Sequence, residues 1–360
     1  MKTSSKVLTI TICLCLLIPA GCAPVLVPNQ NTARWQIFDP NDYGITVVTG
    51  ENGSKRYRWS LDAEFDESNN SIPYWGTETA FLGVPTVQGQ LNGKNYPVVF
   101  DTGNSMGLMI EDIHINRHHL PVWFMDSEDK KNSSGFAIAE SLTVGPLQLN
   151  DYPCSFLKHR TEFRLLGALP VGRFRWVVMP MDMIGQFSYL RYDQIQKELS
   201  FSKNRIFLPA DRSEWITFPL QIETKRILLK TSIEDIEVTL FLDTGAGYQL
   251  ELNTAIIEQL YEQRPDLKKE WVQNTQLYSP YAGGLSKGRK FTAANLKLGN
   301  SILKKAELFY KETPDPNKSY PYKGTNGTIG IGLFDKTAMV LDFKRNLMWV
   351  KKAKGSRFEE

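Results

Sequence analysis

The tripeptide Asp-Thr-Gly occurs twice in this chain of 360 residues, and each copy follows three apolar residues. The first copy, Asp101 to Gly103, ends the segment VVFDTG, and the second, Asp243 to Gly245, ends LFLDTG. An apolar triplet before a carboxylate is typical of a buried strand that delivers the aspartate to its end, and the glycine lets the chain turn sharply. Two aspartates brought close together share a proton, because like charges at contact distance do not both ionise easily. One is then an acid and the other a base, so such a pair can activate a water molecule to attack an amide.

The repeat continues beyond the two tripeptides. Each copy is followed by an alternating strand pattern around a turn glycine, Gly145 in the first half and Gly299 in the second, which predicts a hairpin. Each half then closes with an apolar segment and a final hairpin, over residues 178–201 and 328–349. Because the order is the same in both halves, the sequence predicts two similar units that each supply one aspartate to a shared site.

On these residues the chain resembles the pepsin/retropepsin family of aspartic proteases, over roughly residues 78–352. The resemblance implies an all-β, mainly antiparallel fold of two barrel-like lobes, with a few short helices and a cleft between the lobes. It implies that Asp101 and Asp243 hold the attacking water, and that Thr102 and Thr244 cross-brace the two loops. This chemistry needs no metal and no cofactor.

Around the tripeptides the two halves differ. In the family, a glycine from a later apolar segment lies beside the Asp-Thr-Gly loop, and Gly330 matches it in the second half. Pro180 stands at that place in the first half, where it fixes φ and removes a backbone donor, so it either perturbs the loop or is tolerated at a sheet edge. Asn104 and Ala246 follow the two glycines and lack the hydroxyl that pepsin-like enzymes more often have there. We therefore expect a raised pKa at each carboxyl and a less acidic pH optimum than that of pepsin.

Two segments are candidates for the flap, the hairpin that covers the substrate in this family. One contains Gly135 and Phe136, and the other contains Tyr281 and Gly283, with Tyr281 the better candidate for a flap tyrosine. Both are glycine-containing and loop-like, and both are equally consistent with ordinary hairpin tips. Residues 253–271 place apolar side chains at helical spacing, which predicts one helix after the second catalytic loop.

The N-terminus has the features of an export signal. A positively charged start precedes the apolar residues 7–18, a run too short to span a bilayer, and small residues follow. The sequence up to Cys22 resembles the lipobox of bacterial lipoproteins, which implies cleavage before that cysteine and a diacylglycerol on its sulfur; a plain secretory signal is the alternative. Ala23, rather than an aspartate, follows the cysteine, and in this the chain resembles lipoproteins that are sent to the outer membrane. We therefore expect a lipid-anchored protein of the bacterial cell envelope, facing the periplasm or the exterior.

Composition and the remaining reactive residues exclude several other functions. Cys154 is the only cysteine beyond the lipidated one in the mature chain, so we expect a buried thiol and no internal disulfide. The net charge of the whole chain is +3 with no basic stripe, so nucleic acid is not an expected partner. His114 and His118 are four residues apart, but no glutamate lies between them in the metalloprotease pattern, so we predict no metal site. A Gly-x-Ser-x-Gly motif is absent.

The predicted organisation has five parts: a lipoprotein signal peptide (1–21), a tether with an extra strand region (22–77), two lobes (78–205 and 206–354) and a tail (355–360). The extra strand region either adds a sheet layer or covers the cleft as a propeptide would. Two functions stay open. One is an aspartic endopeptidase that cuts peptide or protein substrates, and the other is a catalytically inactive relative that binds peptides or a protein partner in the inter-lobe cleft. We expect a monomer, because one chain supplies both halves.

Overall fold

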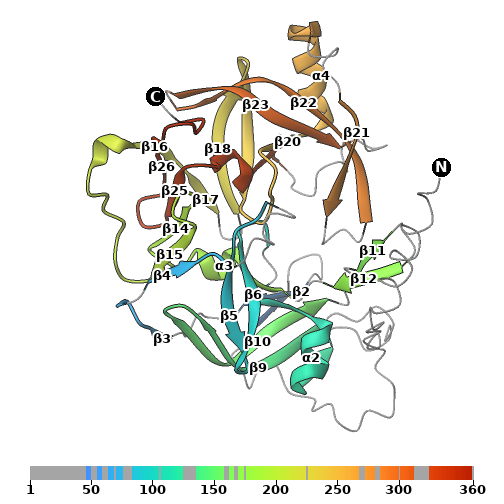
Figure 1. Ribbon diagram of the computed structural model, residues 1–360, viewed down its shortest axis with the longest axis vertical. Coiled ribbons are helices and arrows are strands. Elements are labelled where there is room, and N and C mark those ends of the chain that lie inside the picture. Colours follow the sequence, from blue (N-terminus) through green and yellow to red (C-terminus); the bar gives the residue numbers. More distant parts are fainter. Residues whose placement is uncertain are drawn as a thin grey trace, which may run out of the picture.

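β-strands dominate the protein and helices are few, which confirms the all-β prediction (Figure 1). The computed structural model describes residues 46–49, 55–58, 64–68, 70–75, 83–104, 107–124, 135–157, 162–165, 169–173, 176–223, 226–266, 272–279, 284–299, 301–311 and 324–358. Within these ranges, no helix is both long enough and apolar enough to cross a membrane. The predictions for the signal peptide, the tether and Cys22, and those for Tyr281 and Gly283, fall outside the described residues.

The first half is built on an eight-stranded sheet with the order β3-β10-β7-β13-β6-β5-β9-β8. An additional pairing between β9 and β10 closes the strands from β10 to β9 into a ring. The elements are β3 (Glu64–Phe65), β5 (Thr86–Leu91), β6 (Lys94–Asp101), β7 (Met109–Glu111), α2 (Asp112–His118), β8 (Val122–Phe124), β9 (Gly135–Val144), β10 (Leu147–Leu157), β13 (Val177–Pro180) and α3 (Met181–Ile184).

The second half is built on another eight-stranded sheet, with the order β17-β18-β19-β24-β20-β23-β22-β21. A pairing between β18 and β22 closes the strands from β18 to β22 into a ring. The elements are β17 (Gln221–Glu223), β18 (Arg226–Ile233), β19 (Ile236–Asp243), β20 (Leu250–Leu252), α4 (Thr254–Gln263), β21 (Val272–Ser279), β22 (Gly284–Leu298), β23 (Ser301–Lys311), β24 (Gly327–Gly330) and η5 (Ile331–Phe334). The two rings have the same strand order, so the duplication predicted from the sequence is present in the structure.

A six-stranded sheet with the order β16-β26-β25-β14-β15-β4 joins the two halves, on the left of Figure 1. Its central antiparallel pair takes β14 from the first half and β25 from the second. The strands are β4 (Ser71–Pro73), β14 (Tyr189–Asp193), β15 (Glu198–Ser202), β16 (Trp215–Pro219), β25 (Ala338–Asp342) and β26 (Leu347–Lys351). The remaining elements are the strand pairs β1 (Thr46–Thr49) with β2 (Lys55–Arg58) and β11 (Glu162–Leu165) with β12 (Leu169–Arg173), and the short helix η3 (Arg212–Glu214).

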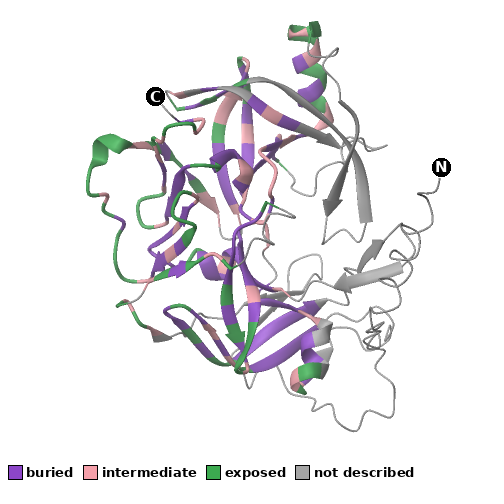
Figure 2. Ribbon diagram, in the orientation of Figure 1, coloured by how far each residue is buried: buried purple, intermediate pink, exposed green. Residues whose placement is uncertain are grey.

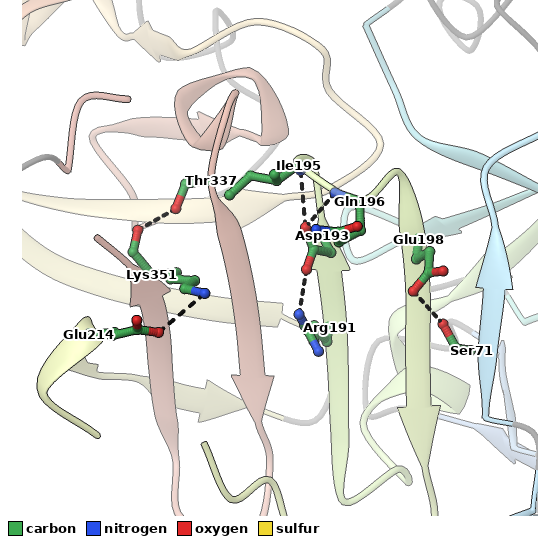
Figure 3. A network of polar contacts seen from close by, with 9 residues as sticks. All are labelled: Ser71, Arg191, Asp193, Ile195, Gln196, Glu198, Glu214, Thr337 and Lys351. Carbon is green, nitrogen blue, oxygen red and sulfur yellow. Dashed lines mark hydrogen bonds and ion pairs between the residues drawn. The ribbon is translucent and has the colours of Figure 1, made fainter. Parts of the chain in front are cut away.

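The two hairpins of this sheet end in matching turns. The Asp193 carboxylate accepts the N–H groups of Ile195 at 3.0 Å and Gln196 at 2.9 Å (Figure 3). The Asp342 carboxylate accepts the N–H of Arg345 at 3.1 Å in the other hairpin. Asp193 at the end of β14 therefore corresponds to Asp342 at the end of β25, and the residues before them in the two strands correspond in the same order.

The predicted boundary at residue 78 separates β4 from the sheet to which it belongs. β4 pairs with β15 at one edge of the six-stranded sheet, as β16 pairs with β26 at the other edge. β4, from the predicted extra strand region, is therefore the counterpart of β16. The predicted tail also needs correction, because Phe358 is only 2% exposed and its ring stacks on Phe334 at 5.7 Å.

Buried residues follow the strands of both rings and of the joining sheet (Figure 2). Both predicted hairpins are present, and their turn glycines, Gly145 and Gly299, each have φ +55°, which favours glycine. The predicted helix is confirmed as α4, although it ends at Gln263 rather than near residue 271. Its first turn is capped by Asn253, whose side chain accepts the N–H of Ile256 at 3.0 Å.

Candidate active site

Asp101 and Asp243 are the last residues of the corresponding strands β6 and β19. The apolar triplets before them are buried, as the sequence pattern predicts. Each aspartate also stands in parallel register with the last residue of a neighbouring strand, Asp101 with Pro180 and Asp243 with Gly330. Strand pairing therefore holds the backbone of both aspartates, independently of the contacts that their loops make.

The loops after the two aspartates have the same hydrogen bonds. The N–H of Gly103 donates to the Asp101 carboxylate and that of Gly245 donates to the Asp243 carboxylate, at 2.8 Å in both cases. The next residue in each loop donates its N–H to the carbonyl oxygen of the aspartate, at 3.2 Å in both halves. Each carboxylate is thus oriented by its own loop.

The two loops are braced against each other by Thr102 and Thr244, both of which have no exposed surface. The Thr102 hydroxyl donates to the carbonyl oxygen of Leu242 at 2.7 Å, and the Thr244 hydroxyl donates to that of Phe100 at 2.6 Å. Each hydroxyl also accepts the N–H of the other threonine at 3.0 Å. These four reciprocal hydrogen bonds join the halves directly beneath the aspartates, as the family resemblance implies.

The two glycines leave room for the carboxyl group of the opposite half. A Cβ atom on Gly103 would lie 2.5 Å from the carboxyl carbon of Asp243, and one on Gly245 would lie 2.4 Å from that of Asp101. Both distances are far shorter than a normal contact, so only glycine allows this approach. The geometry brings the aspartates together across the junction of the two halves.

The carboxyl groups of Asp101 and Asp243 are in hydrogen-bonding contact. Burial raises the pKa of Asp101, although hydrogen bonds from Asp243 and from nearby backbone N–H groups oppose that rise. Burial raises the pKa of Asp243 well above its usual value, and the adjacent charge of Asp101 raises it further. The pair can therefore hold one proton at a pH where isolated aspartates are ionised. The direction agrees with the sequence-based expectation, but burial is the largest cause rather than the missing hydroxyls.

Pro180 does not perturb the first loop. The pairing of its strand with β7 covers only Val177 and Val178, so Pro180 itself pairs with β6 alone. It belongs to β13, which lies between β6 and β7. Its backbone angles, φ −89° and ψ 167°, almost equal those of Gly330, φ −90° and ψ 165°. The residue after each donates its N–H to the corresponding loop, from Met181 to the Asn104 carbonyl at 2.7 Å and from Ile331 to the Ala246 carbonyl at 2.8 Å.

The structure places Gly135 and Phe136 in the body of the first ring. They begin β9, where Phe136 pairs with neighbours on β8 and β10 and is only 1% exposed. Gly135 and Phe136 therefore belong to a strand and not to a hairpin tip. The residues between β8 and β9 lie outside the described ranges. Of the second flap candidate, Tyr281 and Gly283 also lie outside the described residues.

The remaining reactive residues lie apart from the aspartates. His114 is buried with its ring 4.3 Å from that of Tyr96, and His118 Nε2 lies 3.0 Å from the Tyr96 hydroxyl. In the described part of the chain, no group of three or more His, Cys, Asp or Glu residues could hold a metal ion. Cys154 is a buried free thiol, as predicted, and burial raises its pKa.

Tyr192 was not predicted as a site residue, and its hydroxyl donates to the carbonyl oxygen of Phe100 at 2.7 Å. Phe100 immediately precedes Asp101, so this phenol lies just behind the site. The sequence feature that could have pointed to Tyr192 is its hydroxyl, because the matching position of β25 is Leu341.

No protein-family model matches this chain, and a search of the curated proteins finds no significant match. Its function is therefore inferred from the geometry of the two aspartates and their supports.

Proposed function

We propose that this protein is an aspartic endopeptidase with the two-lobed architecture of the pepsin/retropepsin family, in which Asp101 and Asp243 activate one water molecule. The reciprocal bracing of Thr102 and Thr244 is the observation that carries the proposal. A purely structural junction does not require two carboxyl groups in contact, with Asp101 buried and Asp243 partly buried, because burial of carboxylates is costly. Such an arrangement is expected where the shared proton is used in a reaction.

In the proposed reaction the two carboxyl groups have different roles. Asp101 is the ionised member in this proposal, and it accepts a proton from the water as the water oxygen bonds to the peptide carbonyl carbon. Asp243, which holds the shared proton, donates it to the carbonyl oxygen. The tetrahedral intermediate then breaks at the C–N bond, the leaving nitrogen takes the proton from Asp101, and Asp243 recovers its proton from the intermediate. No covalent enzyme intermediate forms.

The matching loop geometry favours this enzyme over an inactive peptide-binding relative. Pro180 was one reason to suspect lost catalysis, beside a blocked cleft, and its backbone angles and neighbouring hydrogen bond match those at Gly330. The further parts of the proposal, anchoring through a lipid on Cys22 in the bacterial envelope and action as a monomer on peptides or proteins, are supported by the sequence alone.

Cleavage of a denatured protein mixture from about pH 3 to about pH 7 tests the proposal, with the new ends identified by mass spectrometry. We expect the wild type to cut within chains, with a maximum above about pH 4, and Asp101→Asn and Asp243→Asn to be inactive. Asp235→Asn is a matched control, because Asp235 is exposed in the turn before β19 and its φ of 74° suits asparagine. Equal cleavage by the wild type and both dyad variants would exclude the proposed mechanism.

A further inference from the structure

Tyr192 is a buried phenol that shares its hydrogen-bond acceptor with the threonine brace. It lies on β14, the central strand that the first half contributes to the joining sheet, and is 1% exposed. Its hydroxyl donates to the carbonyl oxygen of Phe100 at 2.7 Å, and the same oxygen accepts the Thr244 hydroxyl at 2.6 Å. Burial and the nearby aspartates raise the pKa of Tyr192, so the phenol keeps its proton and remains a donor.

At the matching position of the second half the side chain is a leucine. Tyr192 immediately precedes the turn aspartate of β14, and Leu341 immediately precedes the corresponding aspartate of β25. In the hydrogen bonds described above, the Phe100 carbonyl therefore accepts the hydroxyls of both Thr244 and Tyr192, while the Leu242 carbonyl accepts only that of Thr102. The two halves therefore differ in hydrogen bonding at the residue directly before the aspartate, which is Phe100 in the first half and Leu242 in the second.

We infer that Tyr192 is a positioning residue that fixes the Phe100–Asp101 peptide and makes Asp101 the anionic member of the pair. This inference rests on the proposed function and adds to it an origin for the unequal roles of the two aspartates. A phenol hydrogen on the Phe100 oxygen offsets part of the negative charge of that carbonyl, which lies one residue from the Asp101 carboxylate. Without the phenol hydroxyl, the ionised form of Asp101 is stabilised less.

Tyr192→Phe tests this role because it removes only the hydroxyl. We expect kcat to fall roughly fivefold to tenfold with little change in KM, since one hydrogen bond that orients the dyad is lost. The acid limb of the pH profile should also move to higher pH, which a loss of stability alone would not produce.

Tyr189→Phe is the matched control on the same strand. Tyr189 lies three residues earlier, on the opposite face of the sheet, and its hydroxyl accepts a hydrogen bond from Asn70 at 2.8 Å. This variant loses the same atom from a similarly buried phenol but should leave kcat and the acid limb unchanged.

A second readout does not depend on catalysis. In protein with ¹³C-labelled aspartate carboxyl carbons, the lower of the two dyad pKa values should rise in Tyr192→Phe and stay in place in Tyr189→Phe. Unchanged titration in Tyr192→Phe, or an equal change in both variants, would overturn the inference. If the wild type cleaves and the titration does not move, only the role of Tyr192 fails. If the wild type does not cleave, the proposed function fails and the titration alone decides whether Tyr192 positions the dyad.

Discussion

The two halves of the molecule hold their aspartates with the same set of backbone and threonine hydrogen bonds but with different residues beside them. Pro180 ends the strand next to Asp101, and Gly330 ends the strand next to Asp243. Their backbone angles agree within two degrees. The site therefore requires a particular backbone path at this place, and that path is compatible with the fixed φ of proline.

The space around that path differs between the halves. A Cβ atom on Gly330 would lie 2.2 Å from the carbonyl oxygen of Tyr248 and 2.6 Å from that of Ala246. The second loop packs directly against this glycine, whereas the first half accommodates a whole proline ring at the matching position. Glycine is thus needed in the second half for close packing rather than for backbone freedom.

Alanine substitution at these two positions should give the largest difference between the halves. Gly330→Ala should reduce the free energy of unfolding by about 3 kcal/mol, because a backbone oxygen occupies the space of the new Cβ. Pro180→Ala should cost about 1 kcal/mol, from a small loss of packing and a more flexible unfolded chain. Urea unfolding measures both values, and equal losses would contradict the proposed difference in packing.

Valine substitution at the two threonines should instead affect both halves equally. Thr102→Val and Thr244→Val each keep the side-chain shape but remove two of the four reciprocal hydrogen bonds, so each should cost about 2 kcal/mol. The serine variants keep the hydroxyl and serve as controls with smaller losses. A variant pair that differs by more than about 1 kcal/mol in urea unfolding would show that the brace is not symmetric.

The change of the free energy of unfolding with pH should differ between the Asp101 and Asp243 variants, by less than in the substitutions above. The pKa of Asp243 is raised by burial and by Asp101, so the folded state binds this proton more tightly than the unfolded state does. Stability from this group is therefore present below the usual aspartate pKa of about 4 and is lost as the pH rises through the higher folded-state value. Asp243→Asn should flatten that decline more than Asp101→Asn, as measured by thermal unfolding across pH. An identical slope in both variants would mean that the proton is shared evenly.

The sequence predicted the parts of the structure that depend on local pattern. The two strand–Asp-Thr-Gly segments, the hairpins at Gly145 and Gly299 and the helix at Thr254–Gln263 each follow from apolar spacing and turn residues over short stretches. The duplication added long-range information, because two similar halves predict one shared site.

The missed features depend on contacts between residues far apart in the chain. β4 has three residues and pairs with β15 more than a hundred positions later, so no local pattern marks it as part of the joining sheet. Tyr192 contacts Phe100 across 92 positions, and the Phe358 ring lies 6.5 Å from that of Phe218, far earlier in the chain. The proline at position 180 was misjudged because its type shows the lost donor but not the backbone angles that it adopts.

A comparison of kcat for Asp101→Asn, Asp243→Asn and the double variant tests the shared dyad most directly. If the two aspartates act on one water as a unit, each single variant should lose at least about 10³-fold, and the double variant should be no worse than the more damaged single variant. Independent losses that multiply in the double variant, or a single variant that retains substantial activity, would contradict a dyad built from both halves.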